Sequence, residues 1–166
     1  MTPPPSIPHQ RFERQLQRLL EDHAVRNSLG EILANVGVRD PKAAETNYRV
    51  PDLVFVSKDR ASIVGHNWID GGPDLAVEIG SPGDETYDKR PFYARLSVKE
   101  LQIFAHPDRQ PELYRLAGEE YVAVAEDPDG WLPVRTLGIR VRRCPKTGDV
   151  ELAVGRDLIG RIEIPA

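Results

Sequence analysis

Two carboxylates and one lysine are the residues of this sequence best suited to chemistry: Asp52, Glu78 and Lys89. Two carboxylates brought together from neighbouring strand ends can hold Mg²⁺ or Mn²⁺, hard cations that take oxygen ligands and keep water or substrate phosphate in their other positions. A lysine beside them can orient an attacking water and offset the charge that develops on phosphate in the transition state. The set therefore predicts metal-dependent hydrolysis of a phosphodiester, with Asp74 supporting the metal or a bound water.

The segment 74–79 places one of these carboxylates on an apolar strand. Successive side chains of a β-strand point to opposite faces. One face of this strand therefore carries Asp74, Ala76 and Glu78, and the other carries Leu75, Val77 and Ile79. An ionised glutamate in such surroundings is costly unless a cation, a metal or several hydrogen-bond donors meet it.

Structural roles are open for the same residues. Asp52 and Asp74 each follow a proline at the start of an apolar run, where an aspartate commonly accepts hydrogen bonds from local backbone amides. Glu78 can form a structural ion pair with Lys89 or a nearby arginine. A lysine taken alone is most often a solvated surface residue. Asp52, Glu78 and Lys89 together are stronger evidence for a metal-dependent site than any one of them alone.

The composition predicts one soluble domain. The chain has 166 residues, of which 40% are hydrophobic, so we expect a single domain over 9–166 after a proline-rich, extended or disordered lead-in over 1–8. A formal net charge of −4 argues against a broad polycationic surface but leaves room for a local basic groove. The single cysteine, Cys144, excludes an internal disulfide and a multi-cysteine zinc site. Without an apolar run of membrane-spanning length or a signal-peptide pattern, we expect a cytoplasmic protein.

Apolar periodicity predicts one helix followed mostly by β-structure. The helix is expected over 11–23, where the apolar residues Phe12, Leu16, Leu19 and Leu20 recur at helical spacing. Residues 31–38 fit a helical turn or a strand, and the flanking glycines favour the strand. Further strands are expected over 48–56, 74–79 and 101–105, and a short helix begins or bends at Pro91. Antiparallel hairpin strands are expected over 112–116, 121–125, 131–136, 139–142, 150–154 and 161–164.

Other polar residues give weaker signals. The four histidines are His9, His23, His66 and His106. Their spacing is not that of metal ligands, and we assign none of them a ligand role. The run Arg140, Arg142 and Arg143 could follow a phosphate backbone, although a solvated strand face is the commoner meaning. Tyr93 is expected to pack in the core with its hydroxyl at the edge of the site.

The order of these motifs resembles the Uma-type restriction endonucleases, a bacterial family in the PD-(D/E)XK nuclease superfamily. The resemblance rests on residues 49–56, on residues 73–82, and on Asp88-Lys89 followed by Tyr93, and it covers roughly residues 9–141. It implies an α/β or α+β fold with a restriction-endonuclease-like core, a mixed β-sheet flanked by helices, to which the C-terminal antiparallel hairpins are added. It also implies a metal-dependent nuclease site, in which Asp52 matches the first metal-binding aspartate and Glu78 the acidic residue on the next strand.

One position departs from the superfamily pattern. A lysine is expected two residues after the second acid, and this sequence has Gly80 there. The resemblance implies that the following helix supplies the lysine instead, which makes Lys89 the candidate. Hydrolysis at this site therefore requires that Lys89 point toward Glu78.

The predicted function is a Mg²⁺- or Mn²⁺-dependent endonuclease with DNA as its expected substrate. The alternative is a non-catalytic module that keeps the nuclease fold for dimerisation or for binding nucleic acid or protein. A homodimer is expected in either case, because the C-terminal hairpins would otherwise leave strand edges exposed.

Overall fold

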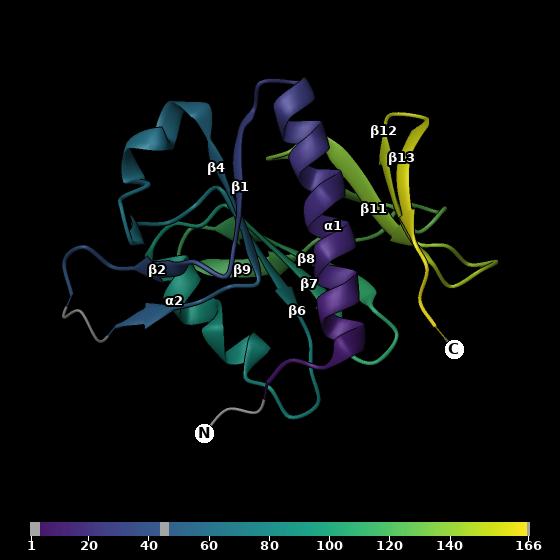
Figure 1. Cartoon of the computed structure of the whole chain (residues 1–166), viewed down its shortest axis with the longest axis horizontal. Helices are drawn as coiled ribbons and strands as arrows, with labels where there is room; N and C mark the ends of the chain where they lie inside the picture. The colour runs from purple at the N-terminus through teal and green to yellow at the C-terminus, as the bar shows by residue number, and fades with distance from the viewer. Residues whose placement is uncertain (1–3, 44–46, 166) are drawn as a thin grey trace.

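A mixed six-stranded sheet forms the centre of the fold (Figure 1). The structure is a computed structural model that describes residues 4–43 and 47–165. In their order across the sheet, the strands are β1 (Gly30–Ala34), β4 (Leu53–Ser57), β6 (Leu75–Ile79), β7 (Glu100–Ala105), β8 (Gln110–Ala117) and β9 (Glu120–Ala123). Only β6 and β7 pair in parallel, and the other neighbours in this sheet are antiparallel.

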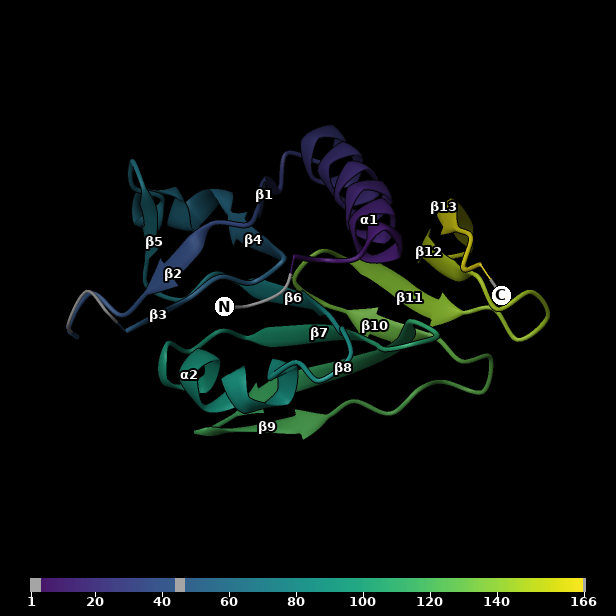
Figure 2. The ribbon, with the colours of Figure 1, turned by 60° about the horizontal axis from the view of Figure 1, so that its bottom comes forward.

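Two smaller sheets and short helical segments surround the central sheet. The four-stranded sheet contains β10 (Leu132–Val134), β11 (Ile139–Arg143), β12 (Val150–Val154) and β13 (Asp157–Ile162). The three-stranded sheet contains β3 (Tyr48–Arg49), β2 (Gly37–Arg39) and β5 (Trp68–Asp70). The helices are α1 (Ile7–Arg26) and α2 (Arg90–Arg95), with 3₁₀ turns η1 (Lys58–Ile63) and η2 (Thr86–Lys89). Figure 2 shows α1 and α2 on opposite sides of β6 and β7.

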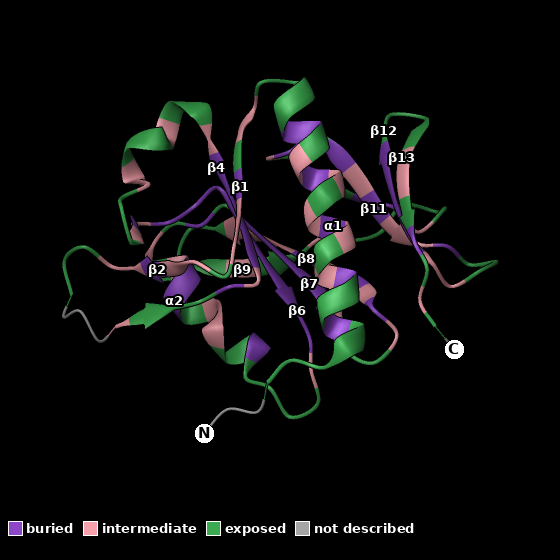
Figure 3. Cartoon of the chain, viewed as in Figure 1, coloured by how far each residue is buried: buried purple, intermediate pink, exposed green. Residues whose placement is uncertain are grey.

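The central sheet buries an apolar core on each face. The core under α1 includes Phe12, Leu16 and Leu20 of the helix and Leu75, Val77 and Ile79 of β6. The core on the other face includes Ala76 of β6 and Phe92 and Tyr93 of α2. These two clusters confirm the alternation expected over 74–79. In Figure 3, β6 is buried along its length, whereas α1 alternates between buried and exposed positions.

Helix α1 is longer than the sequence predicted, at both ends. It begins at Ile7 rather than Arg11 and runs to Arg26 rather than His23. The Ser6 hydroxyl caps it by accepting a hydrogen bond from the backbone nitrogen of His9, at 3.3 Å. A proline fits the first turn of a helix because its missing N–H has no intrahelical acceptor there. Residues 7 and 8 are therefore helical and not extended.

The strand expected over 31–38 is wrong as a single element. Asn35 takes a positive φ of 53° between β1 and β2, and this breaks the strand. Strand β1 pairs with β4 in the central sheet, whereas β2 pairs with β3 and β5 in the three-stranded sheet. Two consecutive short strands thus serve two different sheets.

The C-terminal half is antiparallel, as expected. Strands β8 and β9 extend the central sheet, and β10 to β13 form a sheet of their own. The last strand begins at Asp157, four residues before the predicted position, because the β12–β13 turn is centred on Gly155, which has a positive φ of 58°. Among the described residues, no helix has the length and apolar character needed to cross a bilayer.

Packing of α1 on the central sheet should dominate the stability of the core that lies between them. Leu16 is 1% exposed in the core under α1, so Leu16→Ala should lower the free energy of unfolding by about 2–5 kcal/mol through lost burial and the cavity that remains. Chemical denaturation measures this change. Val25→Ala is the matched control on the same helix, because Val25 is 74% exposed and its truncation should change stability by about 0.5 kcal/mol or less. Equal effects of the two substitutions would contradict the assignment of α1 as a core helix.

Candidate active site

Antiparallel pairing of β4 with β6 brings Asp52 to Glu78. Leu53 is paired with Val77, so the residue before β4 lies beside the residue that follows Val77. A direct contact fixes the arrangement, since the backbone nitrogen of Ile79 donates to Asp52 Oδ2 at 2.7 Å. Two carboxylates that are far apart in the sequence therefore share one end of the sheet. Both line a cleft of about 840 Å³ that also includes Lys89.

Glu78 is a buried carboxylate with two donors. The residue is 2% exposed, Lys89 Nζ lies 2.9 Å from its Oε2, and the Tyr93 hydroxyl donates to its Oε1 at 2.5 Å. Burial raises the pKa of Glu78 to about 7, although Lys89 and Tyr93 act in the opposite direction; the nearby charge of Asp52 raises it further. Glu78 is therefore buried as expected, and the ammonium of Lys89 and the hydroxyl of Tyr93 offset the energetic cost of burying its charge.

Lys89 and Tyr93 reach Glu78 from a single segment. Lys89 is the last residue of η2, and α2 follows it directly with Pro91 in the first turn, where a proline is tolerated. One helical turn after Lys89, Tyr93 lies fully buried in the core, and burial raises the pKa of its hydroxyl well above the ordinary value. The expected positions of both side chains are therefore observed: Lys89 points to Glu78, and Tyr93 packs with its hydroxyl at the site.

Gly80 leaves no room for the lysine that the superfamily pattern places there. A Cβ at this position would lie 2.9 Å from the backbone nitrogen of His106 and 3.3 Å from the backbone oxygen of Phe104. Backbone atoms cannot move away as a flexible side chain could. The close approach of β6 and the end of β7 thus excludes any side chain at position 80, and the ammonium group comes from Lys89 instead.

His9 of α1 also contacts Asp52, and Glu13, one turn further along the helix, contacts His9; neither residue was predicted to belong to the site. His9 Nε2 lies 3.2 Å from Asp52 Oδ1 and 3.6 Å from Glu13 Oε2, and His9 Nδ1 lies 3.1 Å from the Ser81 hydroxyl. The hydrogen bond to Asp52 raises the pKa of His9 against the effect of burial. Burial raises the pKa of Glu13. No histidine was predicted to be a ligand, yet His9 lies in contact with Asp52.

The ligand-type atoms of His9, Glu13 and Asp52 all lie within 4.8 Å of one another, which is close enough for one cation to contact all three. Carboxylate oxygens suit Mg²⁺ and Mn²⁺, and imidazole is also a ligand for transition metals. The sequence signal for this part of the site is the i, i+4 spacing of His9 and Glu13, which places them on one face of a helix. The residues present fit a divalent metal on the side of the cleft that Asp52 occupies.

The structure does not bring Asp74 to this cluster. Asp74 precedes β6 and Glu78 lies near its end, which separates them by about 13 Å along the strand. The Asp74 carboxylate accepts from the backbone nitrogen of Ser57 at 2.7 Å and lies 3.7 Å from Arg60 and 3.5 Å from Lys99. These partners belong to β4, to η1 and to the segment before β7, away from Glu78, so the site we propose below does not include Asp74.

The fold and this cleft define a nuclease-like α+β protein. The fold is similar to the crystal structure of a putative nuclease belonging to DUF820 from Anabaena variabilis, with a TM-score of 0.65 and 14% sequence identity over 82% of this chain and 77% of that one. The chain also matches the Uma2 family, described as putative restriction endonuclease, over residues 1–144. The protein belongs to this family, which confirms the resemblance seen in its motifs. A search of curated proteins finds no match.

The buried hydroxyl of Tyr93 should contribute more to stability than an exposed one with a similar partner. Tyr93→Phe removes a donor from a buried carboxylate and should lower the free energy of unfolding by about 1.5–3 kcal/mol, measured by denaturation. Tyr87→Phe is the control, because the hydroxyl of Tyr87 also donates to a glutamate, Glu112, but Tyr87 is 41% exposed. We expect a change of about 0.5 kcal/mol or less for the control. If the two variants were equally stable, the Tyr93–Glu78 contact would carry no special weight.

Proposed function

We propose that the protein is a metal-dependent endonuclease that hydrolyses phosphodiester bonds, with DNA as its substrate. The observation that carries the proposal is the grouping of Asp52, Glu78 and Lys89 in one cleft, although they come from three separate elements. Membership of a family described as putative restriction endonuclease supports the class of reaction.

Asp52 and Glu78 would hold the metal ion, Mg²⁺ or Mn²⁺, and His9 and Glu13 are the other ligand-type groups beside Asp52. A bound ion of this kind supplies Lewis-acid stabilisation of the charge on phosphate. The backbone nitrogen of Ile79 donates a hydrogen bond to one oxygen of Asp52, which orients this carboxylate for metal binding. At Glu78, Lys89 and Tyr93 favour the ionised form and oppose the burial that raises the pKa of this carboxyl.

Lys89 supplies the positive charge that the chain itself brings to the phosphate. Its ammonium is anchored to Glu78, and its side chain is 24% exposed, so it is both positioned and accessible from the cleft. In this position it orients the attacking water and stabilises charge in the transition state. Tyr93 acts as a positioning residue, because its hydroxyl is buried and donates to Glu78.

Metal-dependent cleavage tests the reaction. Purified protein should nick or linearise plasmid DNA in the presence of Mg²⁺ or Mn²⁺ and should stop when EDTA is added. Glu78→Gln should lower the cleavage rate by at least about 10²-fold, because it removes a charged ligand and the partner of Lys89. Glu119→Gln is the control, since Glu119 is exposed in the turn between β8 and β9. Full activity of Glu78→Gln would refute the assignment of the site.

A pair of lysine variants separates the role of Lys89 from a general effect of charge. Both Lys89 and Lys99 lie near a buried acid, Glu78 at 2.9 Å and Asp74 at 3.5 Å. Lys89→Met should lower the single-turnover cleavage rate by about 10²-fold or more, and Lys99→Met should leave it within about threefold. The measurement is cleavage of a labelled duplex with enzyme in excess. Similar losses in the two variants would argue that Lys89 has no part in the reaction.

A further inference from the structure

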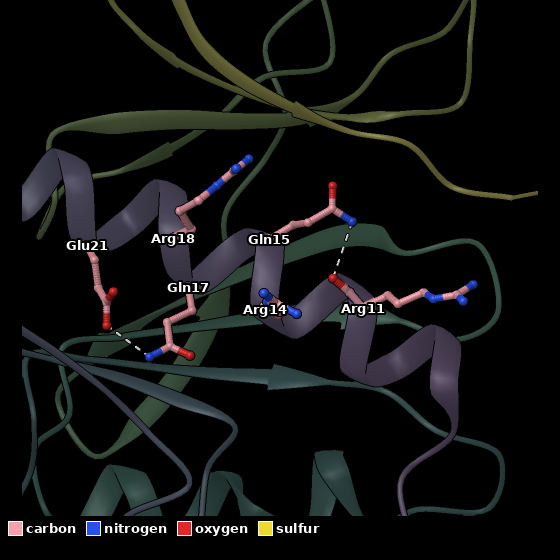
Figure 4. A pocket seen from close by; sticks show the side chains of 6 residues that line it. All are labelled: Arg11, Arg14, Gln15, Gln17, Arg18 and Glu21. Atoms are coloured by element: carbon pink, nitrogen blue, oxygen red, sulfur yellow. Dashed lines mark hydrogen bonds between the residues drawn. The ribbon is translucent and has the colours of Figure 1, made fainter.

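Three arginines follow the solvent face of α1. Arg11, Arg14 and Arg18 are exposed and recur at intervals of three and four residues, which places them on one side of the helix. They line a surface groove together with Gln15, Gln17 and Glu21. Figure 4 shows their side chains extending from successive turns of α1. We call Arg11, Arg14 and Arg18 the arginine row.

The side chains of the arginine row have no hydrogen-bond or ion-pair partner among the described residues. The basic run singled out in the sequence differs in this respect. Its charges are met by acids: Arg140 lies 3.7 Å from Asp127, Arg142 lies 2.9 Å from Glu151, and Arg143 lies 3.5 Å from Asp108. Charges already neutralised within the chain release few counterions on binding a polyanion. The arginine row is therefore the better cationic surface.

The arginine row is continuous with the cleft that contains Asp52 and Glu78. Arg14 and Gln17 line both the surface groove and the cleft, so no other element separates the two. One turn beyond Arg18, Glu21 accepts a hydrogen bond from Gln17 and ends the cationic stretch. A polyanion lying along α1 would thus be led toward the cleft.

We propose that the arginine row binds the phosphate backbone of duplex DNA and directs it into the cleft. This inference rests on the proposed function. From Arg11 to Arg18 the helix rises about 10 Å, and one DNA strand presents a phosphate about every 3.4 Å along its axis. The row therefore matches about three phosphates of one strand. Because the overall net charge is −4, electrostatic attraction for DNA has to come from local cationic surfaces such as this one.

The test measures binding of a fluorescein-labelled 30-base-pair duplex by fluorescence anisotropy. EDTA is present so that no cleavage occurs. The triple variant Arg11→Gln, Arg14→Gln, Arg18→Gln should bind at least about tenfold more weakly than the wild type at low salt. Loss of three phosphate contacts should also reduce the slope of log affinity against log salt by about 2 to 3. Unchanged thermal unfolding, expected for exposed helix positions, verifies that the variant is folded.

The matched control is a second triple variant, Arg26→Gln, Arg135→Gln, Arg156→Gln. These arginines are also exposed, their side chains have no hydrogen-bond or ion-pair partner in the described part of the chain, and none of them lines the cleft or the groove. The control changes the net charge by the same amount but leaves the arginine row intact. It should therefore lose much less DNA affinity and salt dependence. Equal losses in the two triple variants, no loss in the first, or no duplex binding by the wild type would each overturn the proposal.

The cleavage experiments distinguish failure of the arginine row from failure of the proposed function. Wild-type cleavage that needs metal and Glu78, combined with unchanged DNA binding by the first triple variant, would overturn the arginine row alone. Absence of cleavage by the wild type, combined with a selective loss of binding in the first triple variant, would overturn the proposed reaction and leave a DNA-binding surface.

Discussion

The burial of one carboxylate, Glu78, is the constraint on which this structure depends. An unpaired charge at that depth would cost several kcal/mol, and the chain meets it with the ammonium of Lys89 and the hydroxyl of Tyr93. Lys89 ends η2 and Tyr93 lies in α2, which follows directly, so the contacts that stabilise the charge also hold α2 against the sheet. The carboxylate of Glu78, the ammonium of Lys89 and the hydroxyl of Tyr93 therefore serve both local stability and the chemistry that we propose for the site.

A second set of contacts joins the other elements to the same point. Asp52 accepts a hydrogen bond from the Ile79 backbone, which fixes the start of β4 against the end of β6. On its other oxygen Asp52 meets His9 from the first turn of α1, and His9 also contacts Ser81 after β6. The N-terminal helix, two strands and the loop after β6 converge here. The polar end of the sheet is held together by the groups that we propose to bind metal and phosphate.

The parts of this arrangement that depend on local periodicity could be predicted from the sequence. Alternation along residues 74–79 was sufficient to place Glu78 on a face opposite Leu75 and Val77, because the direction of a strand side chain is fixed by its neighbours in the chain. Asp52 and Lys89 were selected by residue type and position in the sequence, and the family resemblance supported both. The partnership of Asp52 with Glu78 depends on the register between β4 and β6, which neither segment encodes alone.

The parts that were missed depend on where an element begins or breaks. No ligand role was predicted for His9 because the four histidines lack metal-ligand spacing. The prolines before it also hid the true start of the helix, which Ser6 caps and which includes Pro8 and His9. Asp74 was given a supporting role on the strand face that it shares with Glu78, but residues on one face of a strand can lie at opposite ends of it. The i, i+4 spacing of His9 and Glu13 becomes informative only once the helix is known to extend that far.

Gly80 affects how nucleases of this kind can be recognised from their sequences. The backbone of His106 and Phe104 approaches this position so closely that only glycine fits, and the ammonium group reaches Glu78 from a different element. A search that requires acid and lysine two residues apart would reject this sequence, although the charged atoms meet in space at 2.9 Å. Relatives with the same substitution are better sought by the separation of charged atoms than by the separation of letters in a motif.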